Sequence, residues 1–394
     1  MPIAGEVAIV GGYTTAFGVL HDRSYLDLLA EAAWGAVEDA GIALDEVEAA
    51  WLATAEPWTA GLVGDSGAAV AEAIPFAPRP VTRVSNFCTS GMEAVRGAAM
   101  AIAAGECQVA IAIGAEKMRD VTPRNSLIAK TAEHTHPTIA KGRTAPGQFA
   151  LLATRYLHAY GATPEDLALV AVKNHAHATR NPKAHFRHPL TKEQVLSAPR
   201  IAEPLGVYDC TPTTDGAAAV VLASRAWAEA HARRHALLEG VGLAVTDGYF
   251  ANLFRESFDF LGFPSTRQAA RLAYSQAGIT NPLQEIDVVE CHDCFTITEI
   301  LNTEDLGFAL PGEGVELLRA GATTLGGSLP VNVSGGLQAC GHPVGATGTR
   351  MVVEIFDQVT GAAGPRQVAQ ARRGLAHTLG GPGVIACVMV IGAP

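Results

Sequence analysis

Charged and aromatic side chains are scarce in this sequence, at 17% and 6% of the 394 residues. Long apolar runs are missing too, because none reaches the ~18 residues that a membrane-spanning helix requires, and we expect no membrane span. The first residues, MPIAGEVAIVGG, lack the basic stretch followed by an apolar segment that marks a secretory signal. These absences predict a globular cytoplasmic protein.

Paired metal-ligand motifs and nucleotide-binding glycine motifs are also missing. The seven cysteines include one C-x-x-C pair, Cys291 and Cys294, but no second pair that would complete a structural zinc site. We therefore expect that no metal is bound. We also expect the thiols to be reduced, as in a cytoplasm. Because no Walker or dinucleotide-binding glycine pattern occurs, neither ATP nor NAD is expected as a cofactor.

The net charge of −11 argues against nonspecific binding to nucleic acids. The charge is distributed unevenly, because the segment from Lys117 to Arg200 holds 13 basic and five acidic residues, with seven of the 13 histidines. A basic segment on an acidic protein favours a local anionic ligand. A charged, solvated insertion without a ligand explains the composition equally well.

What the sequence does contain is a regular alternation of apolar strand patterns and amphipathic helix patterns. With 48% hydrophobic residues, such an alternation predicts βαβ units around a parallel or mixed sheet. Strands are expected at 6–12, 46–56, 80–87, 107–118, 236–245, 285–293 and 383–393. Helices are expected at 25–42, 65–74, 91–106, 267–279, 295–307 and 345–361. Because a strand, a polar loop and a small-residue helix recur in both halves, the pattern also indicates an internal duplication.

Cys88, in NFCTSGMEAV, lies where a strand pattern gives way directly to a helix pattern. At such a turn the free N–H groups and partial positive charge of the helix N-terminus favour a thiolate. The same N–H groups can stabilise an oxyanion that forms on an attacked carbonyl. Cys88 is thus a candidate nucleophile, the alternative being an inert buried cysteine.

Two further segments carry candidate acid–base groups. His342 lies in GGLQACGHPVGATG, a loop with five glycines in 14 residues that leads into a helix. In ECHDCFTITEI, His292 and Cys294 follow a strand at i, i+2 spacing, which points both side chains to one side. An imidazole can take a thiol proton near neutral pH, and a second thiol can shuttle one. A satisfied loop histidine and an ordinary surface loop are the alternatives.

Together these motifs resemble the thiolase superfamily, specifically its sterol-carrier-protein-type thiolases. The resemblance rests on NFCTSGMEAV, DCTPTTDGAAAVVLAS, HDCFTITEI, SGGLQACGHPVGATG and HTLGGPG, which cover nearly the whole chain in order. It implies an α/β thiolase fold with two duplicated βαβαβαββ halves in five layers, αβαβα. The first half would comprise 1–115 and 205–232, the second 233–394, and a basic loop domain at 116–204 would cover coenzyme A (CoA).

The resemblance also implies roles for individual residues. Cys88 corresponds to the nucleophile that carries the acyl group, and His342 to the histidine that activates it and helps form an oxyanion hole. His292 stands where most thiolases have an asparagine that holds a water molecule in that hole. The second catalytic cysteine of ordinary thiolases is replaced by Leu379, so Cys294 would supply the acid–base thiol. Gly381 would offer a backbone N–H near Cys88.

The implied activity is a CoA-dependent acyltransferase of the acetyl-CoA acetyltransferase type, in lipid metabolism such as β-oxidation. It would cleave 3-ketoacyl-CoA, or form it by Claisen condensation, with CoA as substrate and no covalent cofactor. Lys173, Arg180, Lys183 and Arg187 are the candidate cations for the CoA phosphates. A homodimer or tetramer is implied as well.

Two alternatives follow from the same resemblance. The first is a retro-aldolase that cleaves a steroid or lipid acyl-CoA side chain, although such relatives lack the nucleophilic cysteine. The second is a subunit that works only with an OB-fold partner carrying a zinc ribbon. Cys88, His292, Cys294 and His342 together disfavour a purely structural role.

Overall fold

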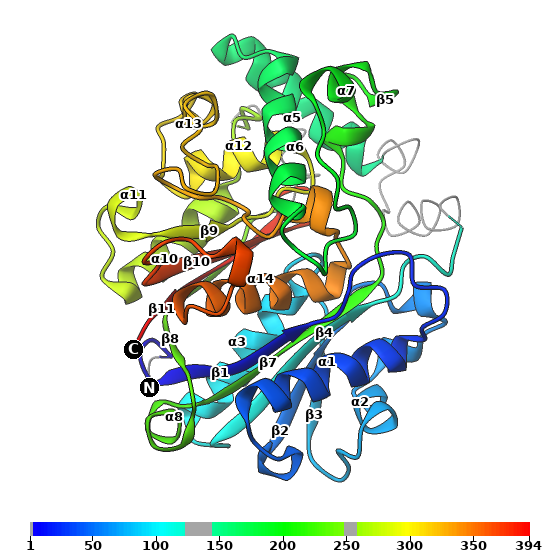
Figure 1. The fold of residues 1–394 in the computed structure, drawn as a ribbon, viewed down its shortest axis with the longest axis vertical. Helices are drawn as coiled ribbons and strands as arrows, with labels where there is room; N and C mark the ends of the chain where they lie inside the picture. Colours follow the sequence, from blue (N-terminus) through cyan, green and yellow to red (C-terminus); the bar gives the residue numbers. More distant parts are fainter. Residues whose placement is uncertain (1–2, 123–143, 248–257) are drawn as a thin grey trace.

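A computed structural model describes residues 3–122, 144–247 and 258–394 of the chain. Its centre is a mixed sheet of nine strands in the order β3-β2-β4-β7-β1-β8-β11-β10-β9 (Figure 1). The strands are β1 (Val7–Thr14), β2 (Ala49–Ala53), β3 (Val81–Val84), β4 (Val109–Glu116), β7 (Gly216–Ser224), β8 (Ala236–Val245), β9 (Val288–Glu290), β10 (Arg373–Gly380) and β11 (Ile385–Gly392).

The sheet consists of two halves that meet between β1 and β8. Strands β3, β2 and β4 are parallel to one another, and β7 and β1 complete the first half in antiparallel pairs. In the second half β8, β11 and β10 are antiparallel, and β9 pairs parallel to β10. Ala8 and Ile9 of β1 pair with Leu237 and Ala236 of β8, which joins the halves into one hydrogen-bonded sheet.

Helices cover both outer faces and fill the space between the half-sheets. Outside the first half lies α1 (Tyr25–Ala40), which packs on β1, β7 and β4, and outside the second lies α10 (Pro264–Ala277), which packs on β8 and β11. Between them lie α3 (Ser90–Ala104) and α14 (Val344–Val359), and α14 contacts strands of both halves. The five-layer α/β architecture predicted from the sequence is therefore confirmed.

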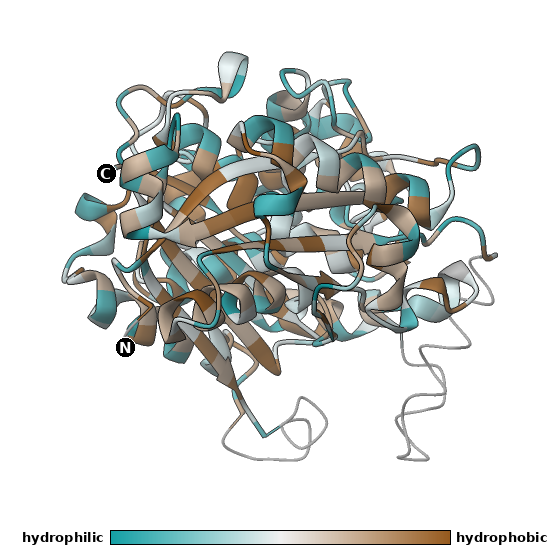
Figure 2. Ribbon diagram, turned by 90° about the horizontal axis from the view of Figure 1, so that it is seen from below, coloured by the Kyte–Doolittle hydropathy of each residue, from teal (hydrophilic) through white to brown (hydrophobic). Residues whose placement is uncertain are grey.

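The burial of these helices follows their sequence patterns. Every residue of α14 except Asp357 is buried, as expected of a helix with neighbours on all sides. Helix α1 buries one apolar face, starts at a Ser24 capping box and ends at Gly41, whose φ of 70° suits a left-handed helix cap. Figure 2 shows the apolar strands crossing the middle of the molecule beneath more hydrophilic helices.

A helical region stands on top of the second half-sheet (Figure 1). It contains α5 (Ala145–Tyr160), α6 (Pro164–Ala178), α7 (Lys192–Ser197) and the two-stranded pair of β5 (Arg200–Ala202) and β6 (Leu205–Gly206). Apart from β6, which begins one residue after its boundary, this region falls within the predicted basic loop domain 116–204, whose segment 123–143 lies outside the described residues. The three domain boundaries remain predictions.

The remaining described α-helices have ten residues or fewer. They are α2 (Ala68–Ala73), α8 (Arg225–His231), α11 (Pro282–Glu285), α12 (Thr296–Asp305) and α13 (Gly314–Arg319). The expected segment 295–307 corresponds to α12. Among the described helices, none is both long and apolar enough to cross a bilayer.

Candidate active site

Cys88 lies in the turn between β3 and α3, as the sequence predicted. Phe87 precedes it in a left-handed conformation with φ of 49° and a half-exposed ring. The Ser90 hydroxyl accepts the Asn86 N–H at 2.7 Å and donates to the Phe87 carbonyl at 2.6 Å, which closes the turn. Cys88 is partly buried and stands immediately before Thr89, the N-cap of α3. The thiol is thereby presented at a helix N-terminus.

Three of the four predicted catalytic side chains meet in space. The Cys88 Sγ and one ring nitrogen each of His292 and His342 all lie within 4.8 Å of one another. The two imidazoles stand nearly perpendicular, with ring centroids 5.1 Å apart. These residues come from a turn after β3, a strand end after β9 and the loop before α14, so the fold brings distant segments to one point.

The hydrogen bonds of His342 fix its tautomer. Its Nδ1 lies 2.7 Å from the Thr347 hydroxyl, and that hydroxyl donates its own hydrogen to the Pro343 carbonyl at 2.9 Å. Since a hydroxyl has one hydrogen, Thr347 must accept from His342, and Nδ1 carries the proton. In the neutral ring Nε2 is then the basic nitrogen, the form that can take a proton from a thiol.

His292 is buried in an environment that keeps its ring neutral. Burial, and secondarily the positive charge of Arg350, lower the pKa of His292 to about 3. Its Nδ1 has no hydrogen-bond partner among the described residues, although it is shielded from solvent. The backbone is held by Asn302, whose amide donates to the His292 carbonyl at 2.7 Å. His292 can therefore donate its single N–H to a substrate oxygen, while its other ring nitrogen can only accept a hydrogen bond.

Cys294 lies beside this group but is not part of it within 4.8 Å. Burial is the main reason that the pKa of the Cys294 thiol is raised well above its ordinary value, and the negative charge of Cys88 adds to the effect. Cys294 is consequently a protonated thiol at neutral pH. That state suits a proton donor and does not suit a second nucleophile.

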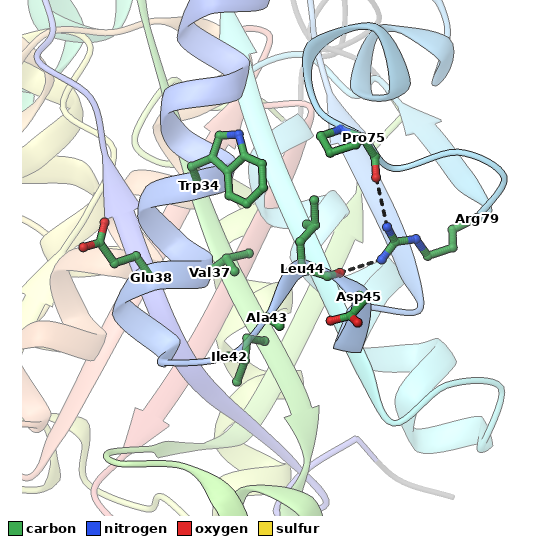
Figure 3. A pocket seen from close by; sticks show the side chains of 9 residues that line it. All are labelled: Trp34, Val37, Glu38, Ile42, Ala43, Leu44, Asp45, Pro75 and Arg79. Atoms are coloured by element: carbon green, nitrogen blue, oxygen red, sulfur yellow. Dashed lines mark hydrogen bonds between the residues drawn. The ribbon is translucent and has the colours of Figure 1, made fainter.

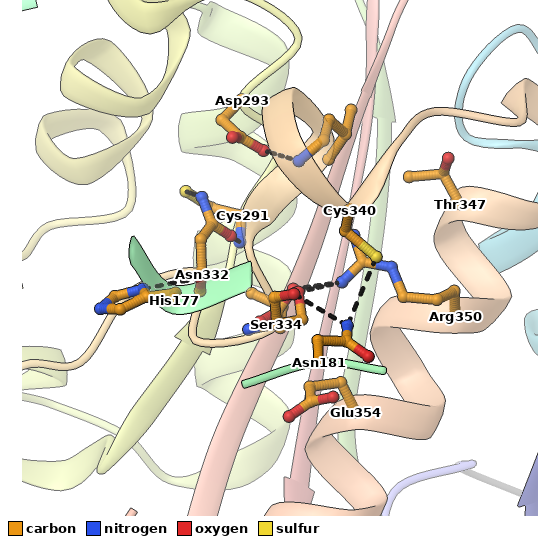
Figure 4. Close-up of polar contacts among 12 residues, drawn as sticks. His177, Asn181, Cys291, Asp293, Asn332, Ser334, Cys340, Thr347, Arg350 and Glu354 are labelled. Carbon is orange, nitrogen blue, oxygen red and sulfur yellow. Dashed lines mark hydrogen bonds and ion pairs between the residues drawn. The ribbon is translucent and has the colours of Figure 1, made fainter. Parts of the chain in front are cut away.

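A buried polar network supports the loop that carries His342 (Figure 4). Arg350 of α14 pairs with Glu290 of β9 and donates to the Ser334 hydroxyl at 2.7 Å. Asp293 accepts the Leu337 N–H at 2.7 Å. The network connects the strand end before His292 with the loop before His342, so both imidazoles rest on one rigid base.

Glu116 holds the other side of the same loop. Its buried carboxyl accepts N–H groups from Ala55, Glu56 and Gly345 at 2.8–3.1 Å. Burial raises its pKa to about 8, with a further contribution from the charge of Glu56. Gly345 has no room for a side chain, because a Cβ there would lie 2.8 Å from two carbonyl oxygens.

Gly381 lies in a tight turn after β10, with φ of 53°. A Cβ at this position would contact the Phe87 ring at 3.6 Å, so this turn and the Cys88 turn are neighbours. The location agrees with the expected contribution to an oxyanion site. That its N–H reaches an oxyanion on a Cys88 adduct remains a prediction.

The four candidate CoA cations lie in different environments. Arg180 and Arg187 are exposed. Lys183 is partly buried, its Nζ lies 3.6 Å from the centre of the Tyr13 ring, and burial lowers its pKa. Lys173 differs from the expectation that it binds CoA, because its ammonium group is buried. It donates to the Asn174 side chain at 2.6 Å and to the Val331 carbonyl at 2.9 Å, and it pairs with Glu299. We therefore remove Lys173 from the CoA ligands.

A surface cavity of about 640 Å³ lies elsewhere, at the end of α1 (Figure 3). Trp34, Leu44 and Pro75 are among its lining residues, and Arg79 closes one side by donating to the Leu44 and Pro75 carbonyls. None of the candidate catalytic residues lines it. The chemistry of the Cys88 group, and not the size of this cavity, identifies the candidate active site.

Several supporting residues were not found from the sequence. Thr347, Glu116 and Arg350 act through contacts between segments far apart in the chain, which a single sequence does not show. A partial signal existed for Thr347, since it lies five residues after His342 in the motif GHPVGATG.

Comparisons with known proteins show the family to which the chain belongs. The family model of the thiolase N-terminal domain matches residues 7–226, and that of the thiolase C-terminal domain matches residues 251–393. An acetyl-CoA acetyltransferase of Methanothermobacter thermautotrophicus is 39% identical over 98% of this chain and 99% of its own length. Human sterol carrier protein 2 is 32% identical over 99% of this chain and 72% of its own.

Two solved structures are similar as well. The Ltp2-ChsH2(DUF35) aldolase has a TM-score of 0.86 and 29% identity, with 100% of this chain and 99% of that chain covered. The human mitochondrial 3-ketoacyl-CoA thiolase shares the fold, with a TM-score of 0.76 and 16% identity over the full length of both chains. The matched domains and full-length relatives confirm the resemblance noted from the sequence, and the chain belongs to the thiolase family.

Proposed function

We propose that the protein is a CoA-dependent acyltransferase that cleaves 3-ketoacyl-CoA, or forms it in reverse, through an acyl thioester on Cys88. The observation that carries this proposal is the group of Cys88, His292 and His342 within 4.8 Å. A thiol at a helix N-terminus next to a basic imidazole nitrogen is the arrangement of an activated nucleophile. The acetyl-CoA acetyltransferase relative supports the same chemistry.

The proposed reaction begins when Cys88 attacks the 3-keto carbon while His342 Nε2 takes the thiol proton. The carbonyl oxygen becomes an alkoxide, which the N–H groups at the start of α3 and near Gly381 stabilise. Collapse of the alkoxide breaks the bond between C2 and C3, leaving the acyl group on Cys88 and the electron pair on the departing enolate. The thioester oxygen of this enolate faces His292 and His342, and Cys294 supplies the proton at C2.

In the second half of the proposed reaction, free CoA takes the acyl group from Cys88. The CoA thiol loses its proton to the Cys294 thiolate formed in the first half, which restores that group. The Cys88 thiolate recovers the proton from His342. Arg180, Lys183 and Arg187 are the proposed partners of the CoA phosphates, because they are the candidate cations that remain after Lys173 is removed.

A second candidate function is retro-aldol cleavage of an acyl-CoA. The similarity to the Ltp2-ChsH2(DUF35) aldolase favours it, and it would bring with it a DUF35 partner protein. A retro-aldolase needs a base for a 3-hydroxyl group but no acyl-accepting thiol. Cys88 therefore distinguishes the two candidates.

The test compares 3-ketoacyl-CoA plus CoA with 3-hydroxyacyl-CoA alone, for wild type, Cys88→Ala and Cys294→Ala. We expect intact-mass measurement to show an acyl adduct on wild type and on Cys294→Ala, and none on Cys88→Ala. Cys294→Ala should turn over at least 10²-fold more slowly, since general acid–base groups contribute about 10²–10⁴-fold. Cleavage of the hydroxyacyl substrate without CoA by Cys88→Ala would establish the aldolase instead.

A further inference from the structure

The active-site cluster has the composition of a metal site as well as that of a catalytic group. It brings together one thiol sulfur and two imidazole nitrogens within 4.8 Å of one another, from residues 88, 292 and 342. No carboxylate belongs to this group of described residues. We propose that Cys88, His292 and His342 bind a zinc ion reversibly, and that the ion blocks the nucleophile.

The spacing needs only a small closure to suit zinc. Zinc bonds of ~2.3 Å to sulfur and ~2.0–2.1 Å to nitrogen place tetrahedral ligand atoms about 3.3–3.6 Å apart. From an outer limit of 4.8 Å, each pair of ligand atoms must approach by at most about 1.2–1.5 Å. Rotation of the partly buried Cys88 side chain can shorten its distances to both imidazoles, and a small movement of the two rings must close the distance between them. Three protein ligands leave the fourth position to water.

The second layer of contacts also suits a metal ligand. Zinc-binding histidines donate the N–H of their other ring nitrogen to a fixed acceptor, which sets the tautomer and orients the ring. His342 already has this arrangement, because its Nδ1–H donates to the Thr347 hydroxyl at 2.7 Å. His292 is buried and has an Nδ1 without a partner among the described residues.

The ligand types define which ion is expected. A thiolate and two imidazoles select zinc or its analogue cobalt, whereas magnesium and calcium prefer oxygen ligands. Binding replaces the Cys88 thiol proton with Zn²⁺ and releases that proton to solvent, so no electrons are transferred. The zinc-bound sulfur is no longer a free nucleophile. The sequence alone predicted no metal site, because it lacks a second C-x-x-C pair, and Cys88, His292 and His342 lie far apart in the chain.

The primary test is alkylation of Cys88 in the intact wild-type protein. After treatment with a chelator, the protein is exposed to iodoacetamide with no metal, with Zn²⁺ or with Mg²⁺, and modification of Cys88 is followed by peptide mass. We expect Zn²⁺ to slow the reaction at least tenfold and Mg²⁺ to leave it unchanged. An unchanged alkylation rate at saturating Zn²⁺ overturns the proposal.

The second test measures binding directly by equilibrium dialysis of Zn²⁺ and by the absorption of bound Co²⁺. Wild type should bind one ion and show a thiolate-to-cobalt charge-transfer band. Cys88→Ala and His292→Ala should each weaken zinc binding at least tenfold, since even an outer-layer partner contributes about 10–100-fold. Cys107→Ala and His231→Ala, which remove a thiol and an imidazole elsewhere, should bind as wild type does.

Equal zinc affinity in wild type and Cys88→Ala would place the ion at other residues and contradict the proposal. Thermal melts of the variants identify any that fail to fold, and the alkylation test on wild type decides the question without them. Neither measurement uses turnover, so failure of the zinc site and failure of the proposed acyltransferase activity are distinguishable.

Discussion

At the scale of single residues, the site depends on hydrogen bonds that set protonation states. Cys88, His292 and His342 are the reacting groups, but Thr347 decides which nitrogen of His342 carries the proton. The motif containing His342 could be found from the sequence and its resemblance to thiolases. The tautomer could not, because it depends on where the single hydroxyl hydrogen of Thr347 goes.

Thr347→Val tests this positioning role. The substitution keeps the shape of the side chain but removes the acceptor for Nδ1–H, so His342 loses its fixed tautomer. We expect kcat/KM for 3-ketoacyl-CoA cleavage to fall roughly 10–100-fold, as for the loss of an outer-layer partner of a metal-bound histidine. Thr347→Ser keeps the hydroxyl and should retain most of the activity. Equal activity of the valine and serine variants would contradict the role.

Glu116 gives a prediction for the pH dependence of stability. Its pKa is raised to about 8 in the folded protein, from an ordinary value of 4.5. Between these values the folded state binds a proton that the unfolded state has lost, so the free energy of unfolding falls as pH rises from about 4.5 to about 8. We expect the stability of Glu116→Gln, measured by urea unfolding, to lack this fall.

Relative to wild type, Glu116→Gln should therefore be less destabilised at pH 8 than at pH 5. Glu48→Gln is the matched control, because Glu48 also accepts two backbone N–H groups but is exposed. Parallel stability profiles of wild type and Glu116→Gln across this range would show that burial does not raise this pKa.

At the scale of elements, α3 and α14 approach so closely that glycine is required on both. A Cβ on Gly91 would lie 2.7 Å from the Thr349 nitrogen, and a Cβ on Gly348 would lie 2.6 Å from the Met92 nitrogen. Both neighbours are backbone atoms, which cannot rotate away. Helix α3 starts next to Cys88 and α14 follows His342, so this contact also sets the distance between the reacting groups.

Gly91→Ala should consequently destabilise the protein by about 1–3 kcal/mol, the usual cost of overpacking. The predicted lower melting temperature is measured by calorimetry, and a lower rate of Cys88 acylation by intact mass. Gly147→Ala in α5 is the control, since its Cβ would meet only the Thr144 hydroxyl, at 3.3 Å. Comparable melting temperatures of the two variants would mean that α3 and α14 separate without cost.

The elements themselves were predictable to the extent that their patterns are local. The apolar stripe and Gly41 identified α1, and continuous apolar runs identified β4 and β11. Strands β7 and β10 were missed as strands, although motifs within them were quoted. Burial of Lys173 could not be foreseen, because a basic residue in a basic segment looks like a surface residue until its partner Glu299 is placed.

At the scale of the whole molecule, the two halves share a sheet and a central helix layer. Strand β1 pairs with β8, and α14 contacts strands on both sides. We therefore expect a single cooperative unfolding transition, with coincident midpoints in near- and far-ultraviolet circular dichroism. Two separated transitions would show that the halves unfold independently. The sequence indicated the duplication, but it did not show that hydrogen bonds continue from one half to the other.

One pairing in this sheet has a practical consequence for protein engineering. Leu237 of β8 pairs with Ala8 near the start of β1 and with Gly392 at the end of β11. These two ends of the chain are therefore two strand spacings apart, about 9.5 Å, and Figure 1 shows them at the same corner. A linker of a few residues would suffice to circularise the polypeptide, so that new termini could be opened in a surface loop with every strand pairing intact.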